Sequence, residues 1–142
     1  MSSAAEIASE LEAFYKGYLD AVNHENMGAL TELFAFPCGL VSGDGGLVII
    51  NNETAHRSFY SKFILDLKAQ GWVRSGIDRF TAWTLADDLA MVLIDFTRYK
   101  ADGSVVDAGR ACYTLRRDGK VWKMLTIAEV KPPFLGPGNL PR

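Results

Sequence analysis

Alternating apolar and polar residues run through Leu89–Val130 and predict three strands joined by two tight turns. The turns carry Asp102-Gly103 and Asp118-Gly119, each between alternating runs. Asp-Gly in this setting is a strong hairpin signal, because a tight primed turn needs positive φ at both central residues. Another alternating run, Val73–Leu85, predicts a strand before these three, with Asp87-Asp88 as the connecting turn.

Two-residue turns would fix which side chains share a face, since directly paired residues lie on the same side of a sheet. One face is then predicted to be largely apolar and to lie under the helices. Its members are Ile77, Arg79, Thr81, Trp83, Ala90, Val92, Ile94, Phe96, Arg98, Asp107, Gly109, Ala111, Tyr113, Leu115, Trp122, Met124, Thr126, Ala128 and Val130. A slip of one residue at any turn would exchange the two faces.

The opposite face mixes aliphatic with charged side chains and places Asp95 opposite Arg110, with Ile127 and Glu129 on the last strand. Paired charges fix the register of an interface more than they add affinity. We therefore interpret Asp95, Arg110 and Glu129 as part of a homodimer interface on the outer sheet face, in preference to a catalytic group.

Helical periodicity and turn residues predict three helices and a small hairpin ahead of the sheet. The helices are expected at Ala4–His24, at Met27–Phe34 after an Asn26 cap, and from Asn51 or Asn52 to Gly71, with the hairpin at Phe36–Val41 and Leu47–Asn51. The chain is thus predicted to form one domain over residues 1–130. Residues 131–142 form a tail rich in Pro and Gly, with Phe134 and Leu135 as possible anchors.

Composition narrows the function classes. A net charge of −2 gives no electrostatic basis for binding nucleic acid or an anionic membrane. The N-terminus lacks the pattern of a signal peptide, and no apolar run approaches the roughly 20 residues of a membrane span, so a soluble cytoplasmic protein is expected. Cys38 and Cys112 sit in apolar contexts and are interpreted as buried free thiols. No metal site and no cofactor are predicted.

Three sequence blocks carry a resemblance to a known superfamily. They are LTELFAFP at Leu30–Pro37, FTRYKADGSV at Phe96–Val105 and RACYTLRRDGKVWKML at Arg110–Leu125. With the order of elements, residues 5–130 resemble the nuclear transport factor 2-like superfamily in its SnoaL-like branch. The resemblance implies three N-terminal helices packed on a strongly curved antiparallel sheet, a cone-shaped α+β barrel. It also implies a pocket at the open end and homodimers through the outer sheet face.

The resemblance does not carry a reaction with it. Ketosteroid-isomerase-like members have a tyrosine on the first helix, an aspartate base just after the second helix and another carboxylate on the sheet. Tyr15 or Tyr18 matches the first of these groups. The segment Phe36–Val41 holds no carboxylate, so the base is missing. Epoxide-hydrolase-like members use two aspartates bridged by an arginine, and Arg98 with Asp107 supplies only part of that set.

Small residues on the predicted inner face leave two alternatives, a helix that approaches closely or a cavity. These residues are Thr81, Gly109, Ala111, Thr126 and Ala128. The predicted ligand-binding residues are Tyr15, Tyr18, Phe59, Arg79, Trp83, Phe96, Arg98, Asp107 and Tyr113. Two guanidinium groups against the one carboxylate of Asp107 would leave a positive surplus, which suits a largely apolar ligand with a carboxylate.

Three functions are consistent with this sequence. The first is a protein that binds a small, largely apolar molecule. The second is a cofactor-independent cyclase, isomerase or dehydratase, with Asp107, His56 or Tyr15 as candidate catalytic groups. The third is a homodimeric interaction module whose inner face is filled. Whether the protein is an enzyme is left open.

Overall fold

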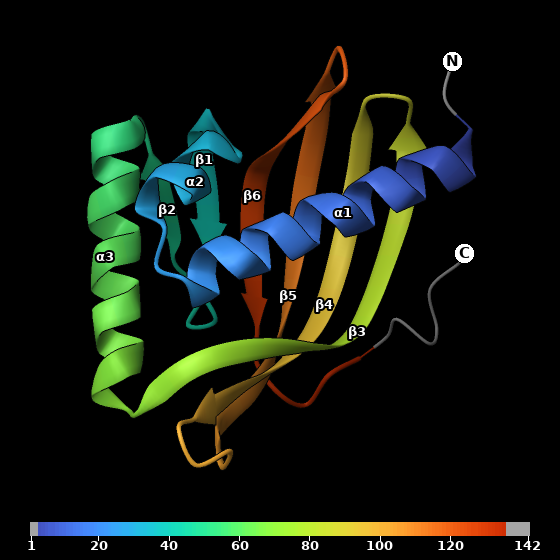
Figure 1. Ribbon diagram of the computed structural model, residues 1–142. Coiled ribbons are helices and arrows are strands. Elements are labelled where there is room, and N and C mark those ends of the chain that lie inside the picture. The colour runs from blue at the N-terminus through green and yellow to red at the C-terminus, as the bar shows by residue number, and fades with distance from the viewer. Residues whose placement is uncertain (1–2, 136–142) are drawn as a thin grey trace.

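The computed structural model describes residues 3–135 and contains helices and strands in the predicted order (Figure 1). The elements are α1 Ala4–Asn23, α2 Met27–Glu32, β1 Phe34–Val41, β2 Leu47–Ile50, α3 Glu53–Ala69, β3 Trp72–Ala86, β4 Leu89–Lys100, β5 Val105–Asp118 and β6 Val121–Val130. Residues 136–142 of the predicted tail lie outside the described residues.

Each helix begins where a side chain satisfies free backbone N–H groups. The Ser3 hydroxyl accepts from Glu6 N, and the Glu6 carboxylate accepts from Ser3 N, which makes a capping box for α1. Asn26 caps α2 as predicted, and Asn52 caps α3. The chain leaves α3 through Gly71, whose φ of +91° suits glycine.

Within the described residues the strands form one six-stranded sheet in the order β2-β1-β6-β5-β4-β3. The predicted α+β fold is confirmed, and the curved sheet does not close into a barrel. The prediction of a purely antiparallel sheet is wrong at one position, because β1 pairs parallel with β6. α1 lies across one face of the sheet, called the inner face below, and α3 stands at the β1–β2 end (Figure 1).

The register between β4 and β5 confirms the predicted pairs Asp95–Arg110 and Arg98–Asp107. The turn itself differs from the prediction, because four residues separate Lys100 from Val105. One extra residue at Val106 compensates for the longer loop and restores the predicted register beyond it. The faces of these two strands therefore match the prediction.

The register between β5 and β6 changes along the strand. The turn consists of Gly119 and Lys120, and Leu115 then pairs with Met124. Leu125 is an extra residue, so that Thr114 pairs with Thr126 beyond it. Because such a bulge exchanges the faces, the inner-face prediction for Thr126, Ala128 and Val130 is wrong. Ile127 and Glu129 lie on the inner face instead, paired with Tyr113 and Ala111.

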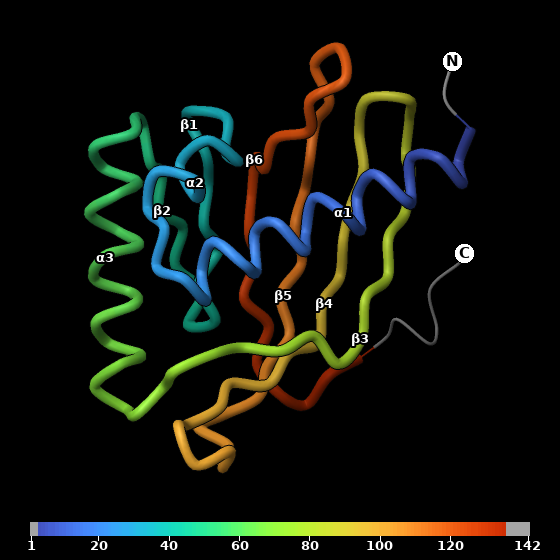
Figure 2. The backbone as a smooth tube through the Cα atoms, in the orientation of Figure 1, coloured from blue at the N-terminus to red at the C-terminus, as the bar shows by residue number. Residues whose placement is uncertain are grey.

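The strand β3 leads into the predicted Asp87-Asp88 turn, but its register also shifts. Ala86 pairs with Leu89 and Thr84 with Ala90, so Leu85 is an extra residue. Another extra residue, Asp78, lies where the pairing shifts again, and β3 bends strongly along its length (Figure 2). As a result Phe80 and Ala82 share the face of Ile94 and Val92, and Arg79, Thr81 and Trp83 lie on the outer face.

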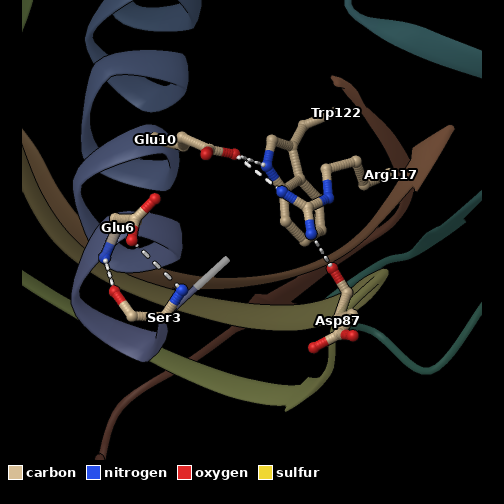
Figure 3. A network of polar contacts seen from close by, with 6 residues as sticks. All are labelled: Ser3, Glu6, Glu10, Asp87, Arg117 and Trp122. Carbon is tan, nitrogen blue, oxygen red and sulfur yellow. Dashed lines mark hydrogen bonds and ion pairs between the residues drawn. The ribbon is translucent and has the colours of Figure 1, made fainter. Parts of the chain in front are cut away.

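A polar network joins the N-terminal half of α1 to the ends of the sheet (Figure 3). Glu10 accepts a hydrogen bond from Trp122 Nε1 at 2.8 Å and forms an ion pair with Arg117 at 3.2 Å. Arg117 also donates to the Asp87 carbonyl at 2.6 Å. One carboxylate thus ties α1 to the β5–β6 hairpin and, through Arg117, to the β3–β4 turn.

Replacing Glu10 with Ala is expected to lower the free energy of unfolding by about 1–3 kcal/mol, because the buried Trp122 N–H loses its acceptor. Urea denaturation measures the change. Glu12→Ala on the same helix is the control, since Glu12 makes an exposed pair with Lys16 and should change stability by less than about 0.5 kcal/mol. Equal losses in the two variants would contradict the structural role given to Glu10.

Candidate functional site

A cavity of about 170 Å³ lies between α3, the β1–β2 hairpin and the inner face of β4, β5 and β6. Five of the predicted ligand-binding residues line it: Tyr18, Phe59, Phe96, Arg98 and Tyr113. Its remaining walls are mainly apolar and include Leu40, Val48, Phe63 and Ile127. The cavity therefore has the character of a small-molecule site, apolar with a few placed polar groups.

Four tyrosines meet at the cavity and hydrogen-bond in pairs. Tyr15 and Tyr18 are three residues apart on α1, so both point toward the sheet. The Tyr18 and Tyr60 hydroxyls are 2.8 Å apart, and those of Tyr15 and Tyr113 are 3.0 Å apart. Tyr18, Tyr60 and Tyr113 line the main cavity, and Tyr15 lines a smaller one beside it.

Burial keeps these phenols neutral. Desolvation is the largest cause that raises the pKa of Tyr15 and Tyr18, although the nearby Arg98 partly opposes it. The pKa of Tyr60 and of Tyr113 is also raised well above the usual value, first by burial. At neutral pH the four hydroxyls are therefore hydrogen-bond donors and acceptors, and none is a base.

Arg98 occupies the cavity wall that the sequence predicted for it. Its guanidinium forms an ion pair with Asp107 at 3.2 Å, and its Cζ lies 4.6 Å from the Phe96 ring centroid and 5.5 Å from that of Phe63. The Asp107 side chain is 44% exposed and does not line the cavity, so it serves as the counter-ion of Arg98.

Because of the bulges, two of the five predicted small residues, Gly109 and Ala111, remain on the inner face. A Cβ at Gly109 would come within 2.7 Å of Phe96 Cζ, so the Phe96 ring fills the space above this glycine. Ala111 lines the cavity directly. Thr81, Thr126 and Ala128 lie on the other face. Of the two alternatives, a helix that approaches closely or a cavity, the structure has a cavity beside Ala111.

Two predicted site residues lie away from the cavity. Arg79 and Trp83 pair with Asp95 and Met91 on the outer face, because the extra residue at Leu85 exchanged the faces of β3. Conversely, Glu129, predicted for the outer face, lines the cavity and accepts from Gly43 N at 3.3 Å. The predicted positive surplus is therefore wrong, since the second arginine lies on the outer face and a second carboxylate takes its place.

His56 is fully buried and does not reach the cavity. Its Nδ1 is 3.3 Å from Thr31 Oγ1, and the Phe34 ring centroid lies 4.3 Å from that of the imidazole. Within residues 3–135, Nε2 has no hydrogen-bond partner. Burial lowers the pKa of His56 to about 4. The structure thus places this candidate catalytic group in the core.

The sequence analysis did not name Tyr60, which lies on the buried face of α3. The buried residues of this helix are His56, Tyr60, Ile64 and Leu67. The spacing of four between His56, Tyr60 and Ile64 contained this signal. Phe59 and Phe63 are half-buried at the edge of the cavity.

On the outer face, Asp95 and Arg110 form the predicted pair, with Arg110 Nη2 donating to Asp95 Oδ2 at 3.0 Å. Arg110 is buried by the chain's own tail, because Nη1 donates to the Leu135 carbonyl and the Phe134 ring lies 4.6 Å from Cζ. The homodimer stays a prediction, and Glu129 does not belong to its predicted surface.

In the described part of the chain, no three His, Cys, Asp or Glu side chains come together as a metal-binding group. Between residues 3 and 135, no helix is long and apolar enough to cross a membrane.

Comparisons with known proteins agree on the fold. The sequence model of a family described as NTF2-like protein (DUF6841) matches residues 9–132. A comparison with curated protein sequences found no match. The SnoaL-like branch of the resemblance is not specifically supported and stays a prediction.

Several solved structures resemble this one at low sequence identity. Aln2 from a Streptomyces species has a TM-score of 0.73 at 16% identity, covering 92% of this chain and 94% of that one. An NTF2-like protein of unknown function from Pseudomonas putida has a TM-score of 0.70 at 18% identity, with 93% and 89% covered. A protein of unknown function with a cystatin-like fold from Nostoc punctiforme has 0.73 at 14%, with 94% and 98% covered. These likenesses show the fold alone.

Replacing Gly109 with Ala is expected to displace the Phe96 ring and to lower the free energy of unfolding by about 1–3 kcal/mol. The control is Gly17→Ala on α1, where an added Cβ meets nothing within 4 Å. That variant should be stabilised by about 0.5–1 kcal/mol through helix propensity. Thermal unfolding of both proteins tests whether the two substitutions have opposite signs.

Because His56 is buried, we expect the folded protein to lose stability in mild acid. Its folded pKa of about 4 lies below the unfolded value, so the unfolded chain takes up the proton first and stability falls as pH drops. The linkage amounts to about 2 kcal/mol between pH 7.5 and 5.

Urea unfolding across this pH range checks the acid effect. His56→Asn should flatten the slope, whatever its effect on stability at neutral pH. The control is His24→Gln, which removes the exposed histidine at the end of α1 and should keep the slope. An unchanged slope in His56→Asn would assign the acid sensitivity to other groups.

Proposed function

The chain belongs to an NTF2-like protein family, and from this premise we propose that it binds one small, neutral, largely apolar molecule in the cavity beside Tyr18 and Tyr113. The observation that carries the proposal is the cavity itself, with its apolar walls and its buried phenols. Dense protein interiors leave few voids larger than a water molecule, so a space of this size in so small a domain needs an explanation.

The size of the cavity suits a single ring. An engineered apolar cavity of about 150 Å³ binds benzene, which gives roughly 25 Å³ for each carbon atom. At about 170 Å³ the cavity has room for about seven such atoms. A single ring would fill it, and a small polar substituent would extend toward the side of the cavity that is open to solvent.

The polar groups of the cavity favour an acceptor atom on the ligand. The pairs Tyr18–Tyr60 and Tyr15–Tyr113 each use one of their two protons, and the Tyr18 and Tyr113 hydroxyls also interact with each other, which leaves at least one O–H of the four free to donate. A carbonyl, amide or hydroxyl oxygen on the ligand would satisfy such a donor. This pairing would be stronger inside the apolar cavity than in water.

The charges of the cavity favour a neutral ligand. Arg98 already has Asp107 as its counter-ion, and Glu129 adds a second carboxylate to the wall. An anionic ligand would have to compete with Asp107 for the guanidinium while lying near Glu129. A cationic ligand would lose its hydration against mainly apolar walls.

We favour binding over catalysis because the candidate acid–base groups lie in the wrong places. His56 is buried away from the cavity, and Asp107 is occupied by Arg98 on the solvent side. Tyr15 has a strongly raised pKa and is reached only through the smaller cavity. The interaction-module alternative required a filled inner face, which the cavity does not support.

Three molecules of nearly equal shape test the charge preference: benzamide is neutral, benzoate is an anion and benzamidinium is a cation. Benzamide is expected to bind at least about tenfold more tightly than either ion, since burying an unpaired charge is strongly unfavourable. Isothermal titration calorimetry measures all three affinities. Tighter binding of benzoate would restore the sequence-based expectation of a carboxylate ligand.

A matched pair of variants locates the binding site for the same titration. Ala111→Leu places extra volume in the cavity and should abolish benzamide binding. Ala108→Leu adds the same volume to the same strand on the outer face and should leave the affinity unchanged. Equal affinities in the two variants would place the ligand elsewhere.

A further inference from the structure

A second cavity of about 50 Å³ lies behind the first, between α1, α3 and β3. Its far walls are apolar and include Leu19, Val22 and Leu67. The two cavities share five lining residues, which are Tyr18, Phe63, Phe96, Arg98 and Tyr113. The two cavities therefore adjoin at the side chains of these residues.

The tyrosines of this partition are firmly placed. Tyr18 and Tyr113 are each less than a tenth exposed, and each is hydrogen-bonded to a second buried tyrosine. Phe96 is fixed by its contact with the backbone at Gly109. Moving any of these rings would break a buried hydrogen bond or close packing, which costs stability.

Arg98 is the flexible, charged member of the partition. Its guanidinium lies between the Phe63 and Phe96 rings, at 5.5 and 4.6 Å from their centroids. Its ion-pair partner Asp107 has a side chain that is 44% exposed, so water can solvate this carboxylate when Arg98 is replaced. The side chain is also long and unbranched up to its planar head, so removing it would open the wall between the cavities.

We propose that Arg98 determines which ligands fit, by separating the main cavity from a second chamber that takes a short apolar chain. The inference rests on the proposed function, because it concerns the ligand of the same cavity. With Arg98 in place, the ligand is limited to about one ring. Without it, the two spaces would form one elongated site, larger by the second cavity and by the volume of the arginine side chain itself.

The n-alkylbenzenes from toluene to n-butylbenzene test this proposal, because they carry no polar group that would fix their orientation. Toluene has seven carbon atoms and matches the main cavity. In the native protein, added CH₂ groups should leave the affinity nearly constant. In Arg98→Ala, each added CH₂ group should improve binding about fourfold, the gain from burying a methylene.

Two further variants separate the volume of Arg98 from its charge. Arg98→Met keeps a long side chain without the ion pair and should retain the flat profile of the native protein. Adding Leu19→Phe to Arg98→Ala fills the second chamber from α1 and should remove the gain with chain length. Circular dichroism checks that each variant is folded.

The outcomes distinguish the two proposals. Native and Arg98→Ala proteins that bind toluene with the same dependence on chain length would overturn the role of Arg98 and leave the proposed function standing. A rising profile in Arg98→Met would overturn it as well, because charge and not volume would then be the barrier. If the folded native protein binds benzamide but neither it nor Arg98→Ala binds any alkylbenzene, this inference is wrong and the proposed function stands. If none of these molecules binds to the folded proteins, both are wrong.

Discussion

One extra residue in β6 determines which side chains the cavity receives. Leu125 has no partner of its own in the pairing with β5, so the strand turns over between Met124 and Thr126. Before this bulge, Trp122 and Met124 pack in the core. Beyond it, Ile127 and Glu129 face inward, and the same half of β6 pairs in parallel with β1. The bulge thus brings the β1–β2 hairpin to the rim of the cavity and supplies its second carboxylate.

The cavity persists because aromatic rings around it satisfy one another. Hydrogen bonds join the buried tyrosine hydroxyls in two pairs, so that each oxygen has a partner inside the protein. Rigid rings also cannot collapse into a neighbouring space as aliphatic chains do, since they have few rotamers. The rigid ring of Phe96 lies over Gly109 and does not fill the space beside Ala111. The cavity, which is partly open to solvent, is therefore bordered on this side by rings with little freedom to fill it.

Periodicity and turn chemistry predicted the order of elements, the β4–β5 register and the positions of Arg98, Tyr18 and Tyr113. They failed for Arg79, Trp83 and Glu129, and each failure has the same cause. Alternation carries a face assignment along a strand only while the pairing stays regular, and each bulge reverses the assignment without leaving a signature in a single sequence. In β4 and β5 the extra residue lies next to the turn, so the prediction remained correct over most of their length.

The misplaced charges change the chemistry of the cavity as well as its geometry. With Arg79 outside and Glu129 inside, the guanidinium of Arg98 is balanced by carboxylates of the protein itself. A side chain neutralised in this way attracts an anionic ligand weakly, yet it still occupies volume between two aromatic rings. For the choice of ligand, the place of Arg98 in the walls of both cavities is then more important than its charge. The sequence singled out Arg98 as a charge that holds the ligand. In the structure Arg98 borders both cavities, and the role that we propose for it depends on its volume and not on its charge.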